Sequence, residues 1–252
     1  MPHSDQPSRR RSILVPVAVA AIAALLAVFA VTANGGSGDD GAAAPTQTPT
    51  STATPDQNDP AQRAFDRLVR RTPDDPLAQG DVDAPVVMID FSDFQCPYCG
   101  EFARTTEHQL YDKYVKTGVL RIEWRDFPYL GKESERAALA ARAAADQGGF
   151  WKFHDALYAE QPSPNSGELT VDHLVQVAES VGLDGARLRA DMNDNRARYK
   201  AAIGKDFQSG QAIGVNGTPA FLINGQAILG AQPLSVFEKA IDQEAAEATS
   251  SR

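Results

Sequence analysis

The order of the apolar strand segments along the chain restricts the fold more than any other sequence feature. Five segments have strand or tight-turn character: residues 86–91, 120–127, 219–223, the Asn224-Gly225 turn and 227–229. Helical sequence fills the interval from about residue 133 to 213, which is far longer than an ordinary connection between strands. This order predicts an α/β sheet domain that is interrupted by an inserted all-helical region.

Further helices are expected on both sides of the insertion. The sequence after Cys96 has helical character until Gly118 ends it. An amphipathic segment begins near Ala61, and a final helix is expected from about residue 234 to 248. The folded domain is therefore predicted to span residues 61–250.

The apolar content of the chain is concentrated near the N-terminus. Residues 13–33 carry no charge and would form a helix about 31 Å long, which is enough to cross the hydrocarbon core of a membrane. Residues 1–12 end in three arginines, so this segment is expected to stay in the cytoplasm while the folded domain lies outside. The prediction is a single-pass signal-anchor in the cell membrane. A secretory signal peptide that is cleaved after Ala33 is the alternative.

Residues 34–60 link the predicted span to the folded domain. They are rich in Gly, Ala, Thr and Pro and contain no large apolar residue. Such a segment cannot bury enough surface to offset the entropy of ordering it, so a disordered tether is expected. As a flexible coil, the tether would have an end-to-end distance of roughly 30 Å.

Charge and cysteine content narrow the function. The net charge is −9, and the only dense basic cluster is residues 9–11. Such a domain is poorly suited to phosphate backbones, so no nucleic-acid partner is expected. The chain has 2 cysteines, which are too few for a framework of structural disulfides. Their spacing indicates either redox chemistry or half of a metal site.

The Cys96-Pro97-Tyr98-Cys99 motif lies at the expected start of a helix that follows a buried strand. The spacing brings two sulfurs close enough to form a disulfide with little backbone movement. Unpaired backbone N–H groups and the helix dipole point at the first sulfur and lower its pKa, and Pro97 is tolerated because it needs no helical N–H partner. Cys96 is expected to lie at the surface and attack, and Cys99 to lie deeper and resolve the mixed disulfide.

The cysteine pair could also form a structural disulfide or bind a metal ion. A structural disulfide across two residues would constrain the unfolded chain little. A structural zinc site needs four ligands, and neither a second cysteine pair nor grouped histidines accompany the motif, so no metal site is predicted. Copper binding through the two thiolates stays open as an alternative.

Two further positions point to exchange chemistry. Asp90 lies inside an apolar strand, where burial would raise its pKa and allow it to exchange a proton with Cys99. An edge-strand aspartate that faces solvent is the alternative. Thr218-Pro219 directly precedes the third strand. Pro219 is either an ordinary trans residue or a cis residue that turns a free backbone edge toward the sulfurs, where an extended substrate would pair.

Together, these segments resemble the DsbA-like branch of the thioredoxin superfamily. The resemblance is carried by APVVMIDFSDFQCPYCGEF, QGGFWKFHDALY and GVNGTPAFLING, and it covers roughly residues 75–245. Glutaredoxins also carry CPYC, but they are shorter and lack the helical block before the Thr-Pro. The resemblance implies a thioredoxin fold with an inserted helical domain, and a redox-active disulfide between Cys96 and Cys99 in place of a cofactor.

The resemblance also implies residue roles and partners. Cys96 would be the nucleophile, Cys99 the resolving thiol, Asp90 the buried acid, and Thr218-Pro219 the cis-proline loop that binds substrate. Family members oxidise secreted proteins and are reoxidised by a membrane quinone-linked partner.

The residues between the cysteines depart from those of the family's strongest oxidants, which carry Pro-His. Tyr98 offers at most a hydroxyl where a histidine would add positive charge, and Asp93 and Glu101 add negative charge nearby. We therefore expect the pKa of Cys96 to lie between about 3.5 and 8.5. The reduction potential is expected between about −270 mV and about −120 mV, the values of thioredoxin and DsbA.

The predicted function is an extracytoplasmic dithiol–disulfide oxidoreductase that oxidises unfolded or reduced secreted or envelope proteins. A thiol reductase or isomerase of the same fold is one alternative, and a metal- or peptide-binding scaffold without oxidase activity is another. The aromatic residues of the segment 150–158 are expected to form the core of the helical region, with His154 as a structural residue among them.

Overall fold

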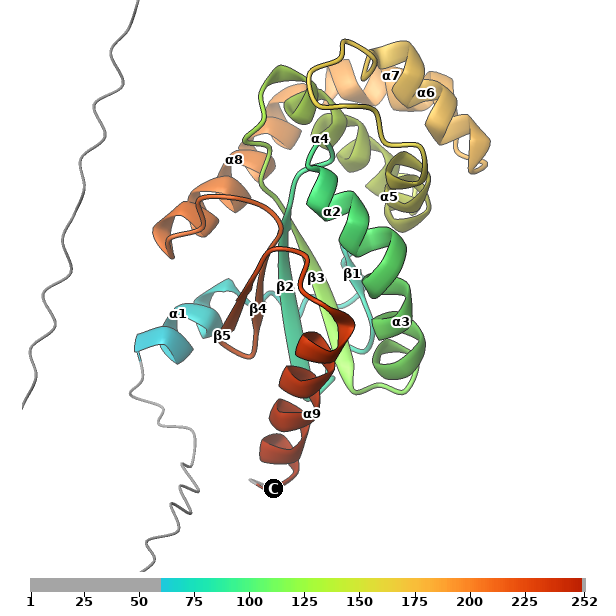
Figure 1. Ribbon diagram of the computed structural model, residues 1–252. Coiled ribbons are helices and arrows are strands. Elements are labelled where there is room, and N and C mark those ends of the chain that lie inside the picture. The colour runs from blue at the N-terminus through green and yellow to red at the C-terminus, as the bar shows by residue number, and fades with distance from the viewer. Residues whose placement is uncertain (1–59, 251–252) are drawn as a thin grey trace, which may run out of the picture. The chain divides into compact units, whose positions relative to one another are not determined.

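The computed structural model describes residues 60–250 of the chain, and these form strands and helices in the order shown in Figure 1. The predicted cytoplasmic segment 1–12, the predicted membrane span 13–33 and the predicted tether up to residue 59 lie outside the described residues. Within the described part of the chain, no helix has the length and apolar content needed to cross a membrane.

A mixed sheet forms the centre of the fold, with the strand order β1-β3-β2-β4-β5. The strands are β1 Ala78–Gln79, β2 Val86–Ser92, β3 Leu120–Asp126, β4 Ala220–Ile223 and β5 Gln226–Leu229. β2 and β3 are parallel, and the other neighbouring pairs are antiparallel. The predicted strand segments all form strands. β1 was not predicted because two residues are too few to show an alternating pattern.

The β4–β5 hairpin turns at the predicted Asn224-Gly225 pair. Both residues have positive φ, 45° and 100°, as a type I′ turn requires. Asn224 Oδ1 also accepts a hydrogen bond from the Val87 N–H at 2.9 Å, and the Asn224 N–H donates to the Val87 carbonyl at 3.0 Å. The turn is thereby fixed to β2, and the segment that precedes β4 is held in place beside the end of that central strand.

The helix after Cys96 continues to residue 115 through two π-helical segments. The helices outside the insertion are α1 Pro60–Leu68, α2 Pro97–Phe102, η1 Ala103–Glu107, α3 His108–Leu110, η2 Tyr111–Val115 and α9 Leu234–Ser250. Gly118, with φ of 74°, lies just beyond the end of the helix, as predicted.

The insertion between β3 and β4 is helical, as predicted. Its helices are α4 Lys132–Ala145, α5 Phe150–Ala159, α6 Val171–Ser180, α7 Gly185–Asp194 and α8 Arg196–Ala212. The alanines of α4 are buried, and their small side chains let neighbouring helices approach closely.

The two faces of the sheet are covered by different helices (Figure 1). On β2, Val86 and Met88 belong to a core with the helix after Cys96 and with α9, whereas Val87, Ile89 and Phe91 pack with residues of α1 and α8. Because side chains alternate along a strand, Asp90 shares the face of Val86 and Met88. The acidic residue of β2 is therefore directed toward the helix that begins at the cysteine motif.

An aromatic cluster joins the insertion to the cysteine loop. Phe94 stacks on Trp124 with ring centroids 5.0 Å apart, and it also contacts Tyr158 at 5.3 Å. His154 is buried among these rings, 5.2 Å from Trp124 and 4.8 Å from Tyr158. The segment 150–158 thus contributes core aromatics, as predicted.

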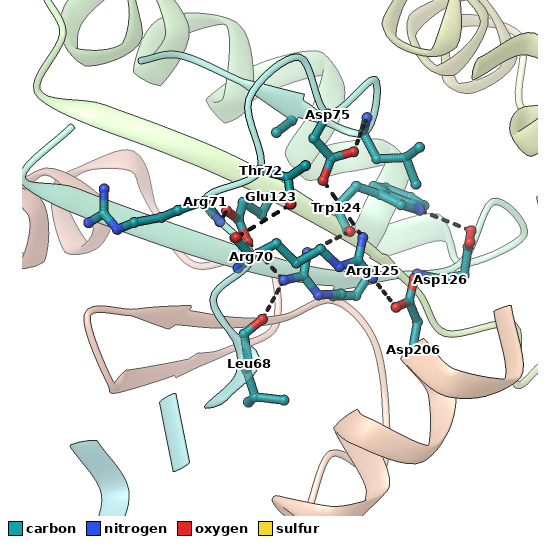
Figure 2. Close-up of polar contacts among 12 residues, drawn as sticks. Leu68, Arg70, Arg71, Thr72, Asp75, Glu123, Trp124, Arg125, Asp126 and Asp206 are labelled. Carbon is teal, nitrogen blue, oxygen red and sulfur yellow. Dashed lines mark hydrogen bonds and ion pairs between the residues drawn. The ribbon is translucent and has the colours of Figure 1, made fainter. Parts of the chain in front are cut away.

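The opposite face of β3 carries a buried ion network that the sequence did not reveal (Figure 2). Glu123 accepts hydrogen bonds from Arg121 at 3.1 Å and from Arg125 at 2.8 Å. The backbone N–H groups of Arg70 and Arg71 also donate to its carboxylate, at 3.0 and 2.9 Å. Burial by itself would raise the pKa of Glu123, but these donors outweigh it and lower the pKa to about 2.

The network extends to the helical insertion. Asp206 of α8 forms ion pairs with Arg70 and, at 2.5 Å, with Arg142 of α4. Arg142 also binds Asp126 at the end of β3, at 2.6 Å. The arginines thereby connect the segment before β1, the sheet and two inserted helices.

Candidate active site

Cys96 occupies the N-cap position of α2, with extended φ and ψ of −73° and 119°, and Pro97 opens the helix. Its carbonyl accepts a hydrogen bond from the Gly100 N–H at 3.1 Å, which closes the first turn. Cys96 and Cys99 are not joined by a disulfide in the structure. A cysteine at this position lies where the N–H groups of the first helical turn have no helical acceptor.

The two thiols have opposite pKa shifts. The hydrogen bond from Cys99 contributes most to lowering the pKa of Cys96, and burial opposes it. Thr218 and the N–H groups of Cys99 and Tyr98 lower the pKa further. The result is a pKa of about 6 for Cys96. The pKa of Cys99 is raised well above 9, mainly by burial. Ionising Cys99 would also break its hydrogen bond to Cys96 and place its charge beside the Cys96 thiolate, and both effects raise the pKa further. At neutral pH the first thiol is therefore mostly ionised and the second is neutral. The value for Cys96 lies inside the range expected from the sequence.

Exposure does not distinguish the cysteines, contrary to the sequence-based expectation. Cys96 is 2% exposed and Cys99 1%, whereas Tyr98 between them is 63% exposed. Cys96 is covered because the segment before β4, more than a hundred residues away along the chain, lies against it. The sequence of the motif itself contains no information about this cover.

Thr218 and Pro219 provide that cover. The peptide bond between them is cis, and the Cys96 thiol donates a hydrogen bond to the Thr218 carbonyl oxygen at 3.2 Å. The side chain of Thr218 also lowers the pKa of both cysteines. The structure thus brings the predicted substrate loop into direct contact with the predicted nucleophile.

Asp90 is fully buried in the central strand, so the alternative of a solvent-facing edge residue is wrong. Burial raises its pKa to about 7, against the opposing effect of the hydrogen bond that Ser92 Oγ donates to Asp90 Oδ1 at 2.5 Å. The charge of the Cys96 thiolate raises the pKa further. Asp90 is therefore a proton donor and acceptor with a pKa close to neutrality, beneath the helix that carries the cysteines.

Asp93 shapes the loop between β2 and α2, a role that the sequence analysis missed. Its carboxylate accepts hydrogen bonds from the backbone N–H groups of Gln95 at 2.8 Å and Leu130 at 3.1 Å. Its carbonyl accepts from the Cys96 N–H at 2.9 Å and from the Tyr158 hydroxyl at 3.0 Å. The Asp93 carboxylate, which the sequence suggested only as a negative charge near Cys96, therefore holds the loop in place.

Gln161, which follows α5, was also not predicted. Its amide donates to the carbonyl oxygens of Phe94 and Cys96, each at 2.9 Å. This approach requires a glycine at position 100, because a Cβ there would lie 2.2 Å from Gln161 Oε1. The glycine after the second cysteine was the only sequence signal for this contact.

Tyr129, which precedes α4, is a further neighbour of the cysteines. It is partly exposed, and burial followed by the charge of the Cys96 thiolate raises the pKa of its hydroxyl, against a hydrogen bond with Thr218. Tyr98 and Tyr129 are therefore the large exposed side chains beside the covered sulfur. Across residues 60–250, no group of three or more His, Cys, Asp and Glu residues is arranged to hold a metal ion.

Comparison with known proteins agrees with this geometry. The family model described as Thioredoxin matches residues 72–243. "Probable disulfide bond formation protein D" of Bacillus anthracis is 30% identical over 169 residues, which cover 66% of this chain and 76% of that protein. The crystal structure of Wolbachia pipientis alpha-DsbA1 superposes with a TM-score of 0.65 at 24% identity, covering 73% of this chain and 98% of the other, and so supports the fold.

A second group of relatives is much longer than this chain. "Na(+)/H(+) antiporter NhaA 1" of Salinispora arenicola is 34% identical over 179 residues, or 70% of this chain. The chain spans only 26% of that antiporter's length. The name of that antiporter therefore does not assign a transport activity to this chain.

The chain belongs to the thioredoxin family, in its DsbA-like branch, with a helical insertion in the fold. It is a protein thiol–disulfide oxidoreductase, and the family works through a redox-active disulfide without a cofactor.

Proposed function

We propose that the protein oxidises cysteine pairs in unfolded or reduced secreted or envelope proteins, with Cys96 as the nucleophile and Cys99 as the resolving thiol. The opposite pKa shifts of the two thiols carry this proposal. A stable Cys96 thiolate favours the dithiol form of the protein over its disulfide, and a disulfide that is readily reduced is a good oxidant. Asp90 serves as the buried acid, and Thr218-Pro219 forms the loop on which the substrate backbone binds.

The oxidising cycle starts from the disulfide form. A substrate thiolate attacks Cys96 Sγ, the bond between Cys96 and Cys99 breaks, and Cys99 leaves as a thiolate that takes a proton from Asp90. A second substrate thiolate then attacks the substrate sulfur of the mixed disulfide and displaces Cys96 as a thiolate. The substrate loses two electrons and gains a disulfide, and the Cys96–Cys99 pair gains the two electrons.

We further propose that this chemistry takes place outside the cytoplasm, on a domain tethered to the cell membrane through residues 13–33. The charge-free span and the preceding arginines support this location. Reoxidation would then fall to a membrane quinone-linked partner. The mass of the protein in the membrane fraction tests the anchor, because cleavage after Ala33 would remove the span and release a shorter, secreted protein.

Oxidation of a reduced test protein by the purified domain is the first test of the mechanism. Cys96→Ser should abolish the activity. Cys99→Ser should stop turnover, but its Cys96 thiolate should still form mixed disulfides with a disulfide-bonded test protein. Glu179→Gln, an exposed substitution on α6, serves as the control. Oxidation by Cys96→Ser at the wild-type rate would contradict the proposed roles.

The direction of the reaction in the cell needs a separate measurement. Alkylation of free thiols in intact cells, followed by separation on a gel, reports whether Cys96 and Cys99 are held as a disulfide or as a dithiol. The proposal predicts that the disulfide predominates. A predominant dithiol would identify the protein as a reductase or isomerase of the same fold.

A further inference from the structure

Glu107, in η1, is a buried carboxyl group outside the site described above. It is 3% exposed, and its Oε1 accepts no hydrogen bond within the described residues. Its nearest basic group is the ring of His154, with 3.7 Å between Glu107 Oε2 and His154 Nε2, and no lysine or arginine of residues 60–250 forms an ion pair with it. A carboxylate in such surroundings is strongly destabilised, so the neutral acid is favoured.

The charge and tautomer of His154 determine whether Glu107 faces a hydrogen-bond donor or an acceptor. His154 Nδ1 lies 2.8 Å from the carboxylate of Asp155, whose side chain is 48% exposed. Burial lowers the pKa of His154, against the effect of Asp155, so the ring is neutral. Since the carboxylate takes the Nδ1–H, Nε2 carries the lone pair and presents an acceptor to Glu107. A neutral acceptor favours a protonated Glu107.

The cluster of Glu107 and His154 lies beside the buried acid of the active site. Asp90 is paired in register with Trp124, and the Trp124 ring is 5.2 Å from the ring of His154. After burial, the charges of Asp90 and then Asp155 raise the pKa of Glu107 further. His108, the next residue after Glu107 along the chain, acts on His154 and helps to keep it neutral. Glu107, His154 and Asp155 thus form a row of polar groups that runs from the neighbourhood of Asp90 to solvent.

The exchange reaction has a proton requirement that Asp90 alone meets poorly. When the disulfide opens, Cys99 leaves as a thiolate and needs a proton, because its own pKa is high. Part of the raised pKa of Asp90 comes from the Cys96 thiolate, which is absent in the disulfide form. In that form Asp90 is therefore more fully ionised, and a second proton source is needed as pH rises through neutrality.

We propose that Glu107 is the proton reserve of the active site: as Asp90 protonates Cys99, the carboxyl proton of Glu107 passes to Asp90, and Glu107 regains a proton from solvent on the Asp155 side. One proton moves at each step, and it ends on Cys99 Sγ. Glu107 acts through Asp90 and is therefore a positioning residue. This role rests on the functions proposed for Cys96, Cys99 and Asp90.

The test is the pH dependence of a single reduction of the disulfide form by excess dithiothreitol, followed by tryptophan fluorescence. The rate is divided by the concentration of dithiothreitol thiolate, because the thiolate is the attacking species. In Glu107→Gln, which keeps the shape but holds no acidic proton, the alkaline fall in this corrected rate should move down to the pKa of Asp90, about 7 or below. Above that pH the variant should be about tenfold slower than wild type, less than a directly acting acid supplies. Glu179→Gln, an exposed substitution on α6, should keep the wild-type profile.

An unshifted alkaline limb, or an equal loss of rate at every pH, would show that Glu107 has only a structural role and would overturn the proposal. Dithiothreitol reduces the disulfide whether or not the protein oxidises substrates in the cell, so this assay can fail independently of the proposed function. If Glu107→Gln does not fold, infrared spectra of Asp90→Asn supply the answer. They should retain the carbonyl stretch of one protonated carboxyl group at neutral pH, and its absence would equally overturn the proposal.

Discussion

Two buried polar clusters lie on opposite faces of the pair of strands β2 and β3. The carboxyl groups of the two clusters have pKa values that are shifted in opposite directions. Glu123 on β3 is surrounded by arginine side chains and backbone N–H groups, and its pKa is lowered to about 2. Asp90 and Glu107, on the other face, form no ion pair with lysine or arginine among the described residues, and their pKa values are raised. Glu123, Asp90 and Glu107 are all buried, so the difference between their pKa shifts comes mainly from the partners.

The comparison indicates which cluster is suited to a structural role and which is suited to proton exchange. A carboxylate that is charged at all physiological pH values can hold elements together but cannot exchange protons. A carboxyl group with a pKa near 7 changes its charge readily, and the protein carries the energetic cost of burying it. The pH dependence of folding should reflect both: the stabilisation by Glu123 is lost as pH falls from about 4.5 to about 2, and the cost of Asp90 grows as pH rises from about 4 to about 7.

The largest effect is expected from removing the charge of Glu123. Glu123→Gln leaves Arg121 and Arg125 buried without their shared counter-charge, and this should lower the free energy of unfolding by about 3–5 kcal/mol at pH 7. Urea denaturation measures the change, with Glu101→Gln as an exposed control. A loss below about 1 kcal/mol would mean that the arginines do not depend on Glu123, and the contrast between the clusters would fail.

Asp90→Asn should act in the opposite direction. The raised pKa of Asp90 means that the folded state binds a proton that the unfolded state has released, so stability falls as pH rises between about 4 and 7. Removing this group should therefore stabilise the protein at pH 8 by on the order of 2–4 kcal/mol and have little effect near pH 4. Thermal or urea denaturation at the two pH values measures it. Equal effects at both would show that Asp90 is not the titrating group.

A third prediction concerns the thiolate. The hydrogen bond from Cys99 is the largest contribution to the low pKa of Cys96, so Cys99→Ala should raise that pKa from about 6 by about one to two pH units. The absorbance of the thiolate near 240 nm, titrated against pH, reports the value directly. If the pKa stays near 6, the N–H groups of the first helical turn, rather than the neighbouring thiol, stabilise the Cys96 thiolate.

The smallest effect is expected where a charge pair is not buried. Asp172 and Arg189 form an ion pair at 2.5 Å, with side chains that are 78% and 45% exposed. Asp172→Asn should change the free energy of unfolding by no more than about 0.5 kcal/mol, and the change should vanish in salt. A loss comparable to that of Glu123→Gln would show that pairing alone, without burial, determines the contribution.

Much of the fold could be predicted because its signals are local. The alternation in β3, the Asn224-Gly225 turn and the glycine after the long helix each follow from a few adjacent residues. The cysteine motif was recognisable for the same reason, since its chemistry depends on the first turn of one helix. The position of Asp90 within an apolar run likewise indicated a buried acid.

The remainder depends on contacts between distant parts of the chain. Arg70 and Asp206 are 136 residues apart, and nothing near either residue in sequence indicates their ion pair. The same holds for Gln161 on the cysteine loop and for the cover that Thr218 places over Cys96. Glu107 escaped notice because a glutamate on a helix usually faces solvent, and only the packing of α5 against η1 buries it.

The exposed Pro97 and Tyr98, set between two covered sulfurs, determine the order of events when a partner arrives. Any polypeptide that approaches the motif meets the tyrosine ring before it reaches either sulfur. We therefore expect contact with Tyr98 to precede sulfur exchange. A side chain that the sequence suggested as a tuning group for the thiolate is thus also the exposed surface beside it.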